Sequence, residues 1–92
     1  MLKIKRRGDF SMMLDELCEE NGELEQIINH QIQWFCKNPN DSRLDNHALT
    51  KKLEGEWAFS ITDDIRIVYE WLGKTTVRFL AIGGHKRVYR RK

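Results

Sequence analysis

From residue 10 onward, the spacing of apolar residues changes once, at the run Asn-Pro-Asn-Asp that occupies residues 38–41. Before this run, apolar residues recur every three to four positions within residues 10–17 and 24–35, the period of an amphipathic helix. After it, apolar and polar residues alternate, which is the period of a strand. A chain with this change is expected to fold as α+β, with a helical layer packed on a sheet.

Turn signals divide the chain into the expected elements. Residues 2–6 alternate and predict a short edge strand. Asp9 or Ser11 is the expected N-cap of the first helix, Asn21 and Gly22 end it, and Glu23 opens a second helix that the run at residues 38–41 stops. The four later strands are expected at residues 47–53, 57–62, 65–72 and 75–82. The predicted order is βααββββ: an N-terminal strand, a two-helix hairpin and a four-stranded antiparallel meander.

Length and composition favour one folded domain over residues 1–92. The chain is 40% hydrophobic and 33% charged, and 92 residues leave no room for a second core. No apolar run approaches the ~20 residues of a membrane span, and the start has no secretory signal, so a cytoplasmic protein is expected. In a reducing cytosol, Cys18 and Cys36 are expected to be buried thiols.

Charge is strongly segregated along the chain. Residues 1–8 carry four cations and no anion, residues 9–36 carry seven anions and no cation, and residues 37–92 carry twelve cations against seven anions. A basic surface beside an acidic helical layer suits a protein that binds nucleic acid with one side. An ordinary solvated charged face explains the charges equally well on their own.

Arg66 stands in the middle of an apolar strand. Alternation places it on the face opposite Ile67 and Tyr69. A guanidinium there needs a partner, which is either a carboxylate (Asp63, Asp64 or Glu70) or a bound anion. Taken alone, the structural ion pair is the simpler interpretation.

Two sequence runs resemble a known family. NPNDSRLDNHALTKKLEGEWAFSITDDIRIVY at residues 38–69 and FLAIGGHKRVY at residues 79–89 are similar to the RelE/ParE superfamily of bacterial toxin–antitoxin toxins. Within it, they resemble the RelE, YafQ and YoeB branch of mRNA interferases. Before residue 38 the similarity is only one of pattern, a strand and two amphipathic helices. The resemblance implies a RelE-like fold.

The resemblance also implies roles for individual residues. His47 matches the position of a catalytic histidine or glutamate, Arg66 the arginine that steadies the scissile phosphate, His85 the C-terminal histidine or arginine, and Tyr89 a nearby aromatic. Asp64 falls where the YafQ branch has a functional aspartate, although that branch often lacks an arginine at the position of Arg66. The chain therefore mixes features of two subgroups.

The chemistry of RNA cleavage requires the residue types that the resemblance implies, namely histidines and an arginine. The 2′-hydroxyl is a built-in nucleophile, so an enzyme needs a base, an acid for the leaving 5′-oxygen and a cation for the phosphorane. The hypothesis makes His47 the base, His85 the acid and Arg66 the cation, and the two histidines could exchange roles. Neither HExxH nor CxxC spacing occurs, so no metal and no cofactor are expected. The expected phosphate contacts are Lys51, Lys52, Arg78, Lys86, Arg87 and Arg90.

The function implied is that of a ribosome-dependent endoribonuclease toxin, with mRNA and a cognate antitoxin as partners. Two alternatives stay open at this point. A ParE-like toxin would poison DNA gyrase without cleaving RNA, but that branch generally lacks the histidine pair. An inactive nucleic-acid-binding module would use only the basic surface. Trp57 is expected in the core, and His30 is expected to be structural.

Overall fold

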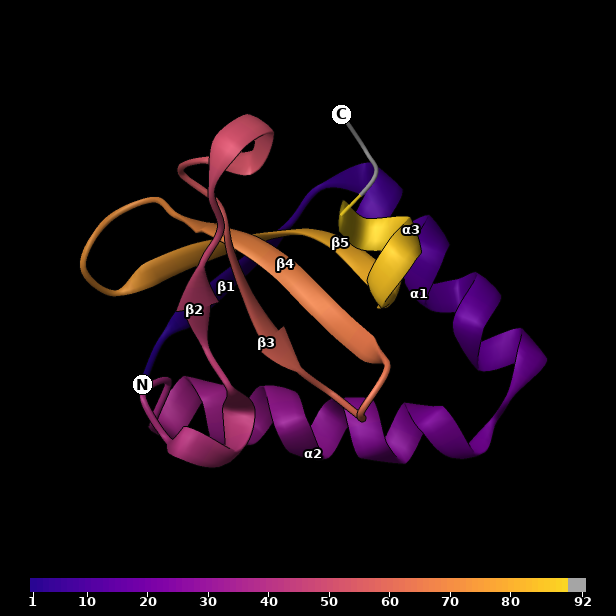
Figure 1. The fold of residues 1–92 in the computed structure, drawn as a ribbon. Helices are drawn as coiled ribbons and strands as arrows, with labels where there is room; N and C mark the ends of the chain where they lie inside the picture. The colour runs from indigo at the N-terminus through magenta and orange to yellow at the C-terminus, as the bar shows by residue number, and fades with distance from the viewer. Residues whose placement is uncertain (90–92) are drawn as a thin grey trace.

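The computed structural model describes residues 1–89, which fold as α+β (Figure 1). The elements follow the predicted order, with one additional helix at the end. Their bounds are β1 Lys3–Arg6, α1 Gly8–Glu20, α2 Glu23–Lys37, β2 His47–Ala48, β3 Trp57–Ser60, β4 Ile65–Trp71, β5 Thr76–Gly84 and α3 His85–Tyr89, with 3₁₀ turns η1 Ser42–Leu44 and η2 Lys51–Leu53. No helix among these residues is long and apolar enough to cross a membrane.

The strands form one mixed sheet in the order β1-β5-β4-β3-β2. The four later strands are antiparallel neighbours, so the predicted meander is confirmed. β1 lies at one edge, as expected, and pairs in parallel with β5. The chain between β1 and β5, which contains the helical hairpin and the strands β2, β3 and β4, provides the long connection that a parallel pairing requires.

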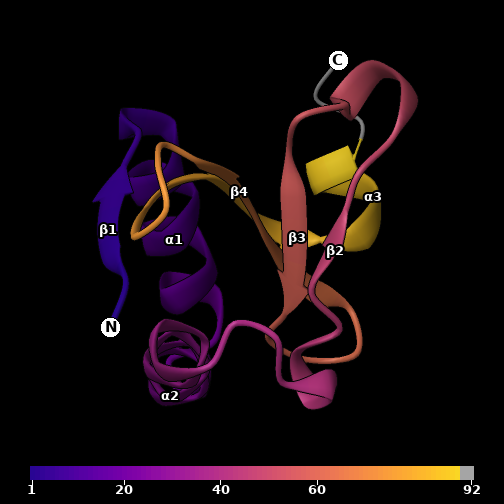
Figure 2. The ribbon, with the colours of Figure 1, turned by 90° about the vertical axis from the view of Figure 1, so that its left-hand side faces the viewer.

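The hydrophobic core lies between one face of the sheet and the first two helices. Figure 2 shows α1 and α2 on one side of β4 and β5, with α3 on the other. Phe35 of α2 stacks on Phe59 of β3 with ring centroids 4.2 Å apart, and it meets the edge of Tyr69 of β4 at 4.9 Å. All three rings are buried. Trp57 is half-buried and packs against this cluster, in line with its expected place in the core.

The start of α1 differs from the prediction. The helix begins at Gly8 with Arg7 as its N-cap and no side-chain cap. Asp9 and Ser11, the expected caps, lie inside the helix. Asp9 instead accepts two hydrogen bonds from the Arg7 guanidinium, at 2.7 Å from Nε and 2.9 Å from Nη2. Both side chains are about half exposed, and the carboxylate still stands in the first turn, where the helix dipole favours it.

The strand predicted over residues 47–53 is wrong beyond its second residue. Extended pairing stops after Ala48, and Lys51 takes a left-handed backbone conformation with φ of 57°. Residues 51–53 then form the turn η2, which buries Leu53. Lys51 and Lys52 therefore project from a turn at one end of β2 and β3, not from opposite faces of a strand.

Candidate functional site

The face of the sheet opposite the α1–α2 layer carries the predicted site residues. His47 pairs with Ala58 and Ala58 with Val68, so these residues share one face. Arg66 lies two residues before Val68 and shares that face, as the alternation predicted. Val88 of α3 packs against Ala58 and Val68 there. The short helix thus covers part of the face that holds His47 and Arg66.

His47 is held in one tautomer by the backbone. Its Nδ1 lies 2.7 Å from the carbonyl oxygen of Asp45, and a carbonyl can only accept a hydrogen bond. Nδ1 therefore carries the proton, and in the neutral ring Nε2 keeps the lone pair. Asp45 has a left-handed backbone with φ of 49°, which turns its carbonyl toward the ring.

The loop that carries this carbonyl is tied to the core by Asn46. The buried Tyr69 donates a hydrogen bond from its hydroxyl to Asn46 Oδ1 at 2.7 Å, and Asn46 Nδ2 donates to the Pro39 carbonyl at 3.0 Å. Sequence reasoning missed both Asp45 and Asn46. One signal was present, because a tyrosine predicted on the core face needs a partner for its hydroxyl.

Arg66 is anchored by backbone carbonyls. Its Nη1 donates to the Thr62 carbonyl at 2.6 Å and more weakly to that of Ile65 at 3.4 Å. Within residues 1–89, neither Asp63 nor Asp64 forms an ion pair with it, and Glu70 pairs with Arg78. The simpler structural interpretation is therefore wrong. Among residues 1–89, this half-buried guanidinium has no carboxylate partner, which suits an anionic ligand.

Tyr89 brings His85 and Arg66 together. The His85 and Tyr89 rings meet edge to face, with centroids 4.4 Å apart. Burial raises the pKa of Tyr89, and the nearby positive charge of Arg66 opposes part of that rise, while Asp45 adds to it. The phenol is thus within electrostatic range of Arg66 and of Asp45 in the loop that holds His47, and α3 places it on this face of the sheet. The four residues predicted as catalytic therefore lie on one surface.

Asp64 serves as a support for α3 in this structure. Its Oδ1 accepts a hydrogen bond from the His85 backbone N–H at 3.3 Å. A methyl group added at Gly84 would lie 3.1 Å from Asp64 Oδ2, so the two residues are in close contact. This carboxylate fixes the point at which the chain leaves β5 and enters the helix that carries His85 and Tyr89.

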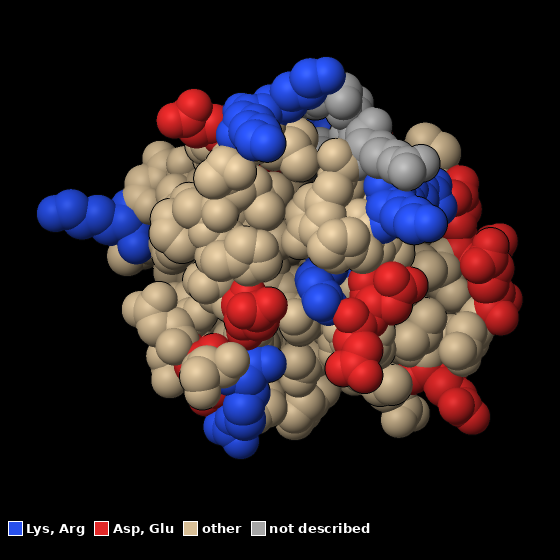
Figure 3. All heavy atoms as spheres, in the orientation of Figure 1, with Lys and Arg blue, Asp and Glu red and all other residues tan. Residues whose placement is uncertain are grey.

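The predicted phosphate contacts fall into two groups. Arg78 is paired with Glu70, and Arg87 with Glu16 at 3.0 Å. Lys51, Lys52 and Lys86 are exposed, and Arg90 lies outside the described residues. Figure 3 shows the basic side chains of this face in separate groups, with acidic side chains near several of them and a broad uncharged surface between. The basic character of the surface is thus local.

Metal ligands do not gather on this surface. Within residues 1–89, no three side chains of His, Cys, Asp or Glu come together in a group that could hold a metal ion.

Solved structures match this chain over almost its whole length, although no family model and no curated protein matches its sequence. A copper-bound mutant toxin from Helicobacter pylori is 25% identical with a TM-score of 0.78, covering 96% of this chain and 99% of that one. YafQ from E. coli is 18% identical with a TM-score of 0.78, covering 97% and 99%. A chain of the E. coli DinJ–YafQ complex gives 18% and 0.76, with the same coverage.

Proposed function

The chain belongs by its fold to the RelE/ParE superfamily of toxins, and from that premise we propose that it is the toxin of a toxin–antitoxin system and cleaves mRNA. The reaction is attack of a 2′-hydroxyl on the neighbouring phosphate, without a metal ion. The observation that carries the proposal is the grouping of His47, Arg66, His85 and Tyr89 on the sheet face opposite the α1–α2 layer.

His47 is the base in this scheme. Its Nδ1 proton is committed to the Asp45 carbonyl at 2.7 Å, so the lone pair on Nε2 is the one that takes a proton from the 2′-hydroxyl. The Asp45 carbonyl also stabilises the imidazolium that forms, as a neutral acceptor next to the charged ring. This geometry supports the assignment of His47 as the base, one of the two that the sequence left open.

Arg66 stabilises the phosphorane. Two carbonyls anchor Nη1, and a guanidinium has further N–H groups that fit the oxygens of a phosphate. Because the anchor fixes the side chain before the substrate arrives, little reorganisation is needed as negative charge develops.

His85 is the acid that protonates the leaving 5′-oxygen. Its ring is exposed and is oriented by the edge-to-face contact with Tyr89. The histidine stands at the first residue of α3, and Asp64 holds its backbone N–H. A positioned acid or base typically contributes ~10²–10⁴-fold to the rate.

The partners proposed are a cognate antitoxin and mRNA on the ribosome. The E. coli DinJ–YafQ toxin–antitoxin complex supports an antitoxin, since a chain of this complex shares the fold. Ribosome dependence rests on the family resemblance and on a physical argument. A chain of this size has little surface with which to orient flexible RNA, and the ribosome would supply that positioning.

Primer extension on a translated mRNA after induction of the protein tests this function. An in vitro reaction without ribosomes is run for comparison. Cleavage during translation only is expected for the wild type, and His47→Ala, Arg66→Ala and His85→Ala should each lose ~10²-fold or more. Lys74→Ala, an exposed cation in the β4–β5 turn, is the matched control. Growth arrest without RNA cleavage would favour the gyrase-poisoning alternative, and RNA binding alone the inactive module.

A further inference from the structure

Arg43 of the turn η1 lies over the indole ring of Trp34 of α2. The guanidinium carbon is 3.8 Å from the centroid of the indole ring. Asp41 binds the edge of the same guanidinium, with Oδ1 3.1 Å from Nε and Oδ2 2.9 Å from Nη2. The Arg43 side chain is nevertheless 69% exposed, so the face of the guanidinium that turns away from Trp34 is open to solvent.

A pocket adjoins this stacked pair on the surface of α2. His30, Gln33, Trp34 and Lys37 line it, and the His30 ring meets Trp34 at 73° with centroids 5.8 Å apart. The lining therefore combines aromatic rings, an amide that can donate or accept, and a flexible cation. Such a mixture matches a nucleobase and its phosphate better than an aliphatic ligand.

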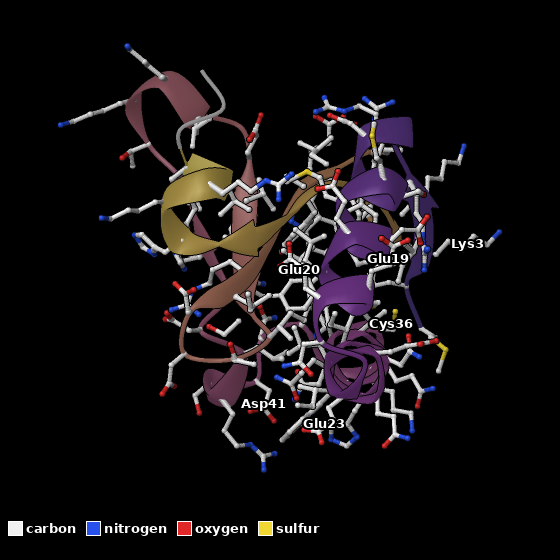
Figure 4. The ribbon with its side chains drawn as sticks, turned by 90° about the vertical axis from the view of Figure 1, so that its right-hand side faces the viewer. Lys3, Glu19, Glu20, Glu23, Cys36 and Asp41 are labelled. Atoms are coloured by element: carbon white, nitrogen blue, oxygen red, sulfur yellow. The ribbon has the colours of Figure 1, made fainter. Side chains whose placement is uncertain are left out.

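The distribution of charge in the helical layer favours RNA binding at the C-terminal end of α2. Figure 4 looks onto the connection between α1 and α2, where Glu19, Glu20 and Glu23 are labelled. No anion follows from residue 26 to residue 40, and Lys37 ends the helix. Asp41 offsets the charge of Arg43 at this end, which leaves Lys37 as the cation that attracts RNA, whereas the acidic end of α2 repels it.

The stacked pair and the candidate site share a short segment. Arg43 precedes His47 by four residues, and the loop between them supplies the Asp45 carbonyl that holds the His47 ring. Figure 2 shows the turn η1 on the same side of the molecule as β2 and α3. One RNA strand bound at His47 can therefore continue past Arg43 without crossing the sheet.

We propose that Trp34 and Arg43 form a stacking platform for one unstacked base of the single-stranded RNA substrate, with Lys37 at an adjacent phosphate. This inference rests on the proposed function in taking RNA as the substrate. The base stacks on the open face of the Arg43 guanidinium, and Asp41 keeps that plane in place. Base stacking of this kind is sequence-tolerant, because every base has a π-face.

Binding of a 2′-O-methyl RNA oligonucleotide, which cannot be cleaved by 2′-hydroxyl attack, tests the platform by fluorescence anisotropy. Arg43→Lys keeps the charge and loses the plane, and it should weaken binding roughly fivefold or more. Lys37→Ala should weaken binding and reduce its salt dependence. Lys74→Ala is the control and should bind as the wild type does. Circular dichroism of each variant checks its fold.

Intrinsic fluorescence gives a second measurement on the same probe. RNA should quench the wild-type tryptophan emission, and Trp34→Phe should lose that share of the quenching. An oligonucleotide with abasic sites should bind wild type and Arg43→Lys equally, because no base is left to stack.

The outcomes separate the two proposals. Unchanged RNA affinity in Arg43→Lys would overturn the platform, even if the wild type cleaves mRNA, and so would a lack of RNA binding by the wild type. If Arg43→Lys weakened the binding of an antitoxin peptide and left RNA binding unchanged, that result would overturn the platform as well. Arg43-dependent RNA binding by a chain that never cleaves mRNA would support the platform and refute the nuclease.

Discussion

The His85 ring meets the Tyr89 ring edge to face at 85°, with their centroids 4.4 Å apart. The two residues are one helical turn apart on α3, where i and i+4 side chains face each other. The positive charge of Arg66 also acts on Tyr89, where it opposes part of the rise in the pKa of the phenol. One phenol thus orients the proposed acid and lies beside the proposed phosphate ligand, which makes its ring and its hydroxyl separable by mutation.

Tyr89→Phe should retain most of the cleavage activity, and Tyr89→Ala should lose more. The phenylalanine keeps the edge-to-face contact that orients His85 and removes only the hydroxyl near Arg66. The alanine removes both and leaves the His85 ring free to rotate, which weakens proton transfer that depends on position. We expect about a tenfold gap between the two variants in the rate of mRNA cleavage during translation. Equal loss in both would mean that the hydroxyl, not the ring, is what matters.

Asp64 should act through the position of α3 and not through its charge. Asp64→Asn keeps an oxygen acceptor for the His85 N–H, so its activity should stay within a fewfold of wild type. Asp64→Ala removes the acceptor and should destabilise the start of α3 by roughly 0.5–1 kcal/mol. We expect lower activity in that variant, with faster amide exchange in α3. Strong inactivation by Asp64→Asn with a stable fold would instead indicate a chemical role for the carboxylate.

The helices and the meander could be predicted because burial of one side imposes a period on the sequence. Phe35 and Tyr69 occur at positions that this period requires, and both are buried. The helix α3 escaped prediction because five residues are too few to show a period. The turn η2 escaped because the left-handed conformation of Lys51 leaves no trace in a Lys-Lys-Leu sequence.

The site was predictable in its residue types more than in its contacts. Alternation placed Arg66 on the correct face, since a strand has only two. Its hydrogen bonds go to carbonyl oxygens, which every residue has and no sequence pattern marks. The tautomer of His47 is decided by a carbonyl in the same way. The approach of Tyr89 to Arg66 depends on α3 folding back over the sheet.

The stability of the wild-type protein should be more sensitive to alkaline pH than that of the Tyr69→Phe variant. Burial raises the pKa of Tyr69 to about 12 from its ordinary value of 10.0. The neutral hydroxyl favours folding, so its contribution is complete below pH 10 and is lost as the pH rises through about 12. The loss amounts to about 2–3 kcal/mol of unfolding free energy at most.

Urea unfolding at pH 8 and pH 11.5 measures this difference. At pH 8, Tyr69→Phe should be about 1 kcal/mol less stable, because the hydrogen bond to Asn46 is gone. At pH 11.5 the gap should narrow or reverse, because only the wild type has a phenol here that ionises in the unfolded chain while the fold keeps it largely neutral. The two proteins share every other titrating group, including Tyr89, whose effects cancel in the comparison. A gap that stays constant between the two pH values would contradict the prediction.

On the sheet face that carries the candidate site, the exposed lysines should contribute more to RNA binding than the cations that are paired with carboxylates. Lys51 and Lys52 project from η2 and are exposed, so each contact they make with a phosphate releases a counterion. The double variant Lys51→Ala/Lys52→Ala should reduce the magnitude of the slope of log K against log salt by roughly 1.4, at about 0.7 for each contact with single-stranded RNA.

Arg78 is paired with Glu70, so Arg78→Ala should change the slope little. Glu70→Gln should then strengthen binding, because it frees the Arg78 guanidinium for phosphate. Salt titrations of the anisotropy signal with the 2′-O-methyl oligonucleotide report all three slopes, and an unchanged slope in the double lysine variant would place the RNA away from η2.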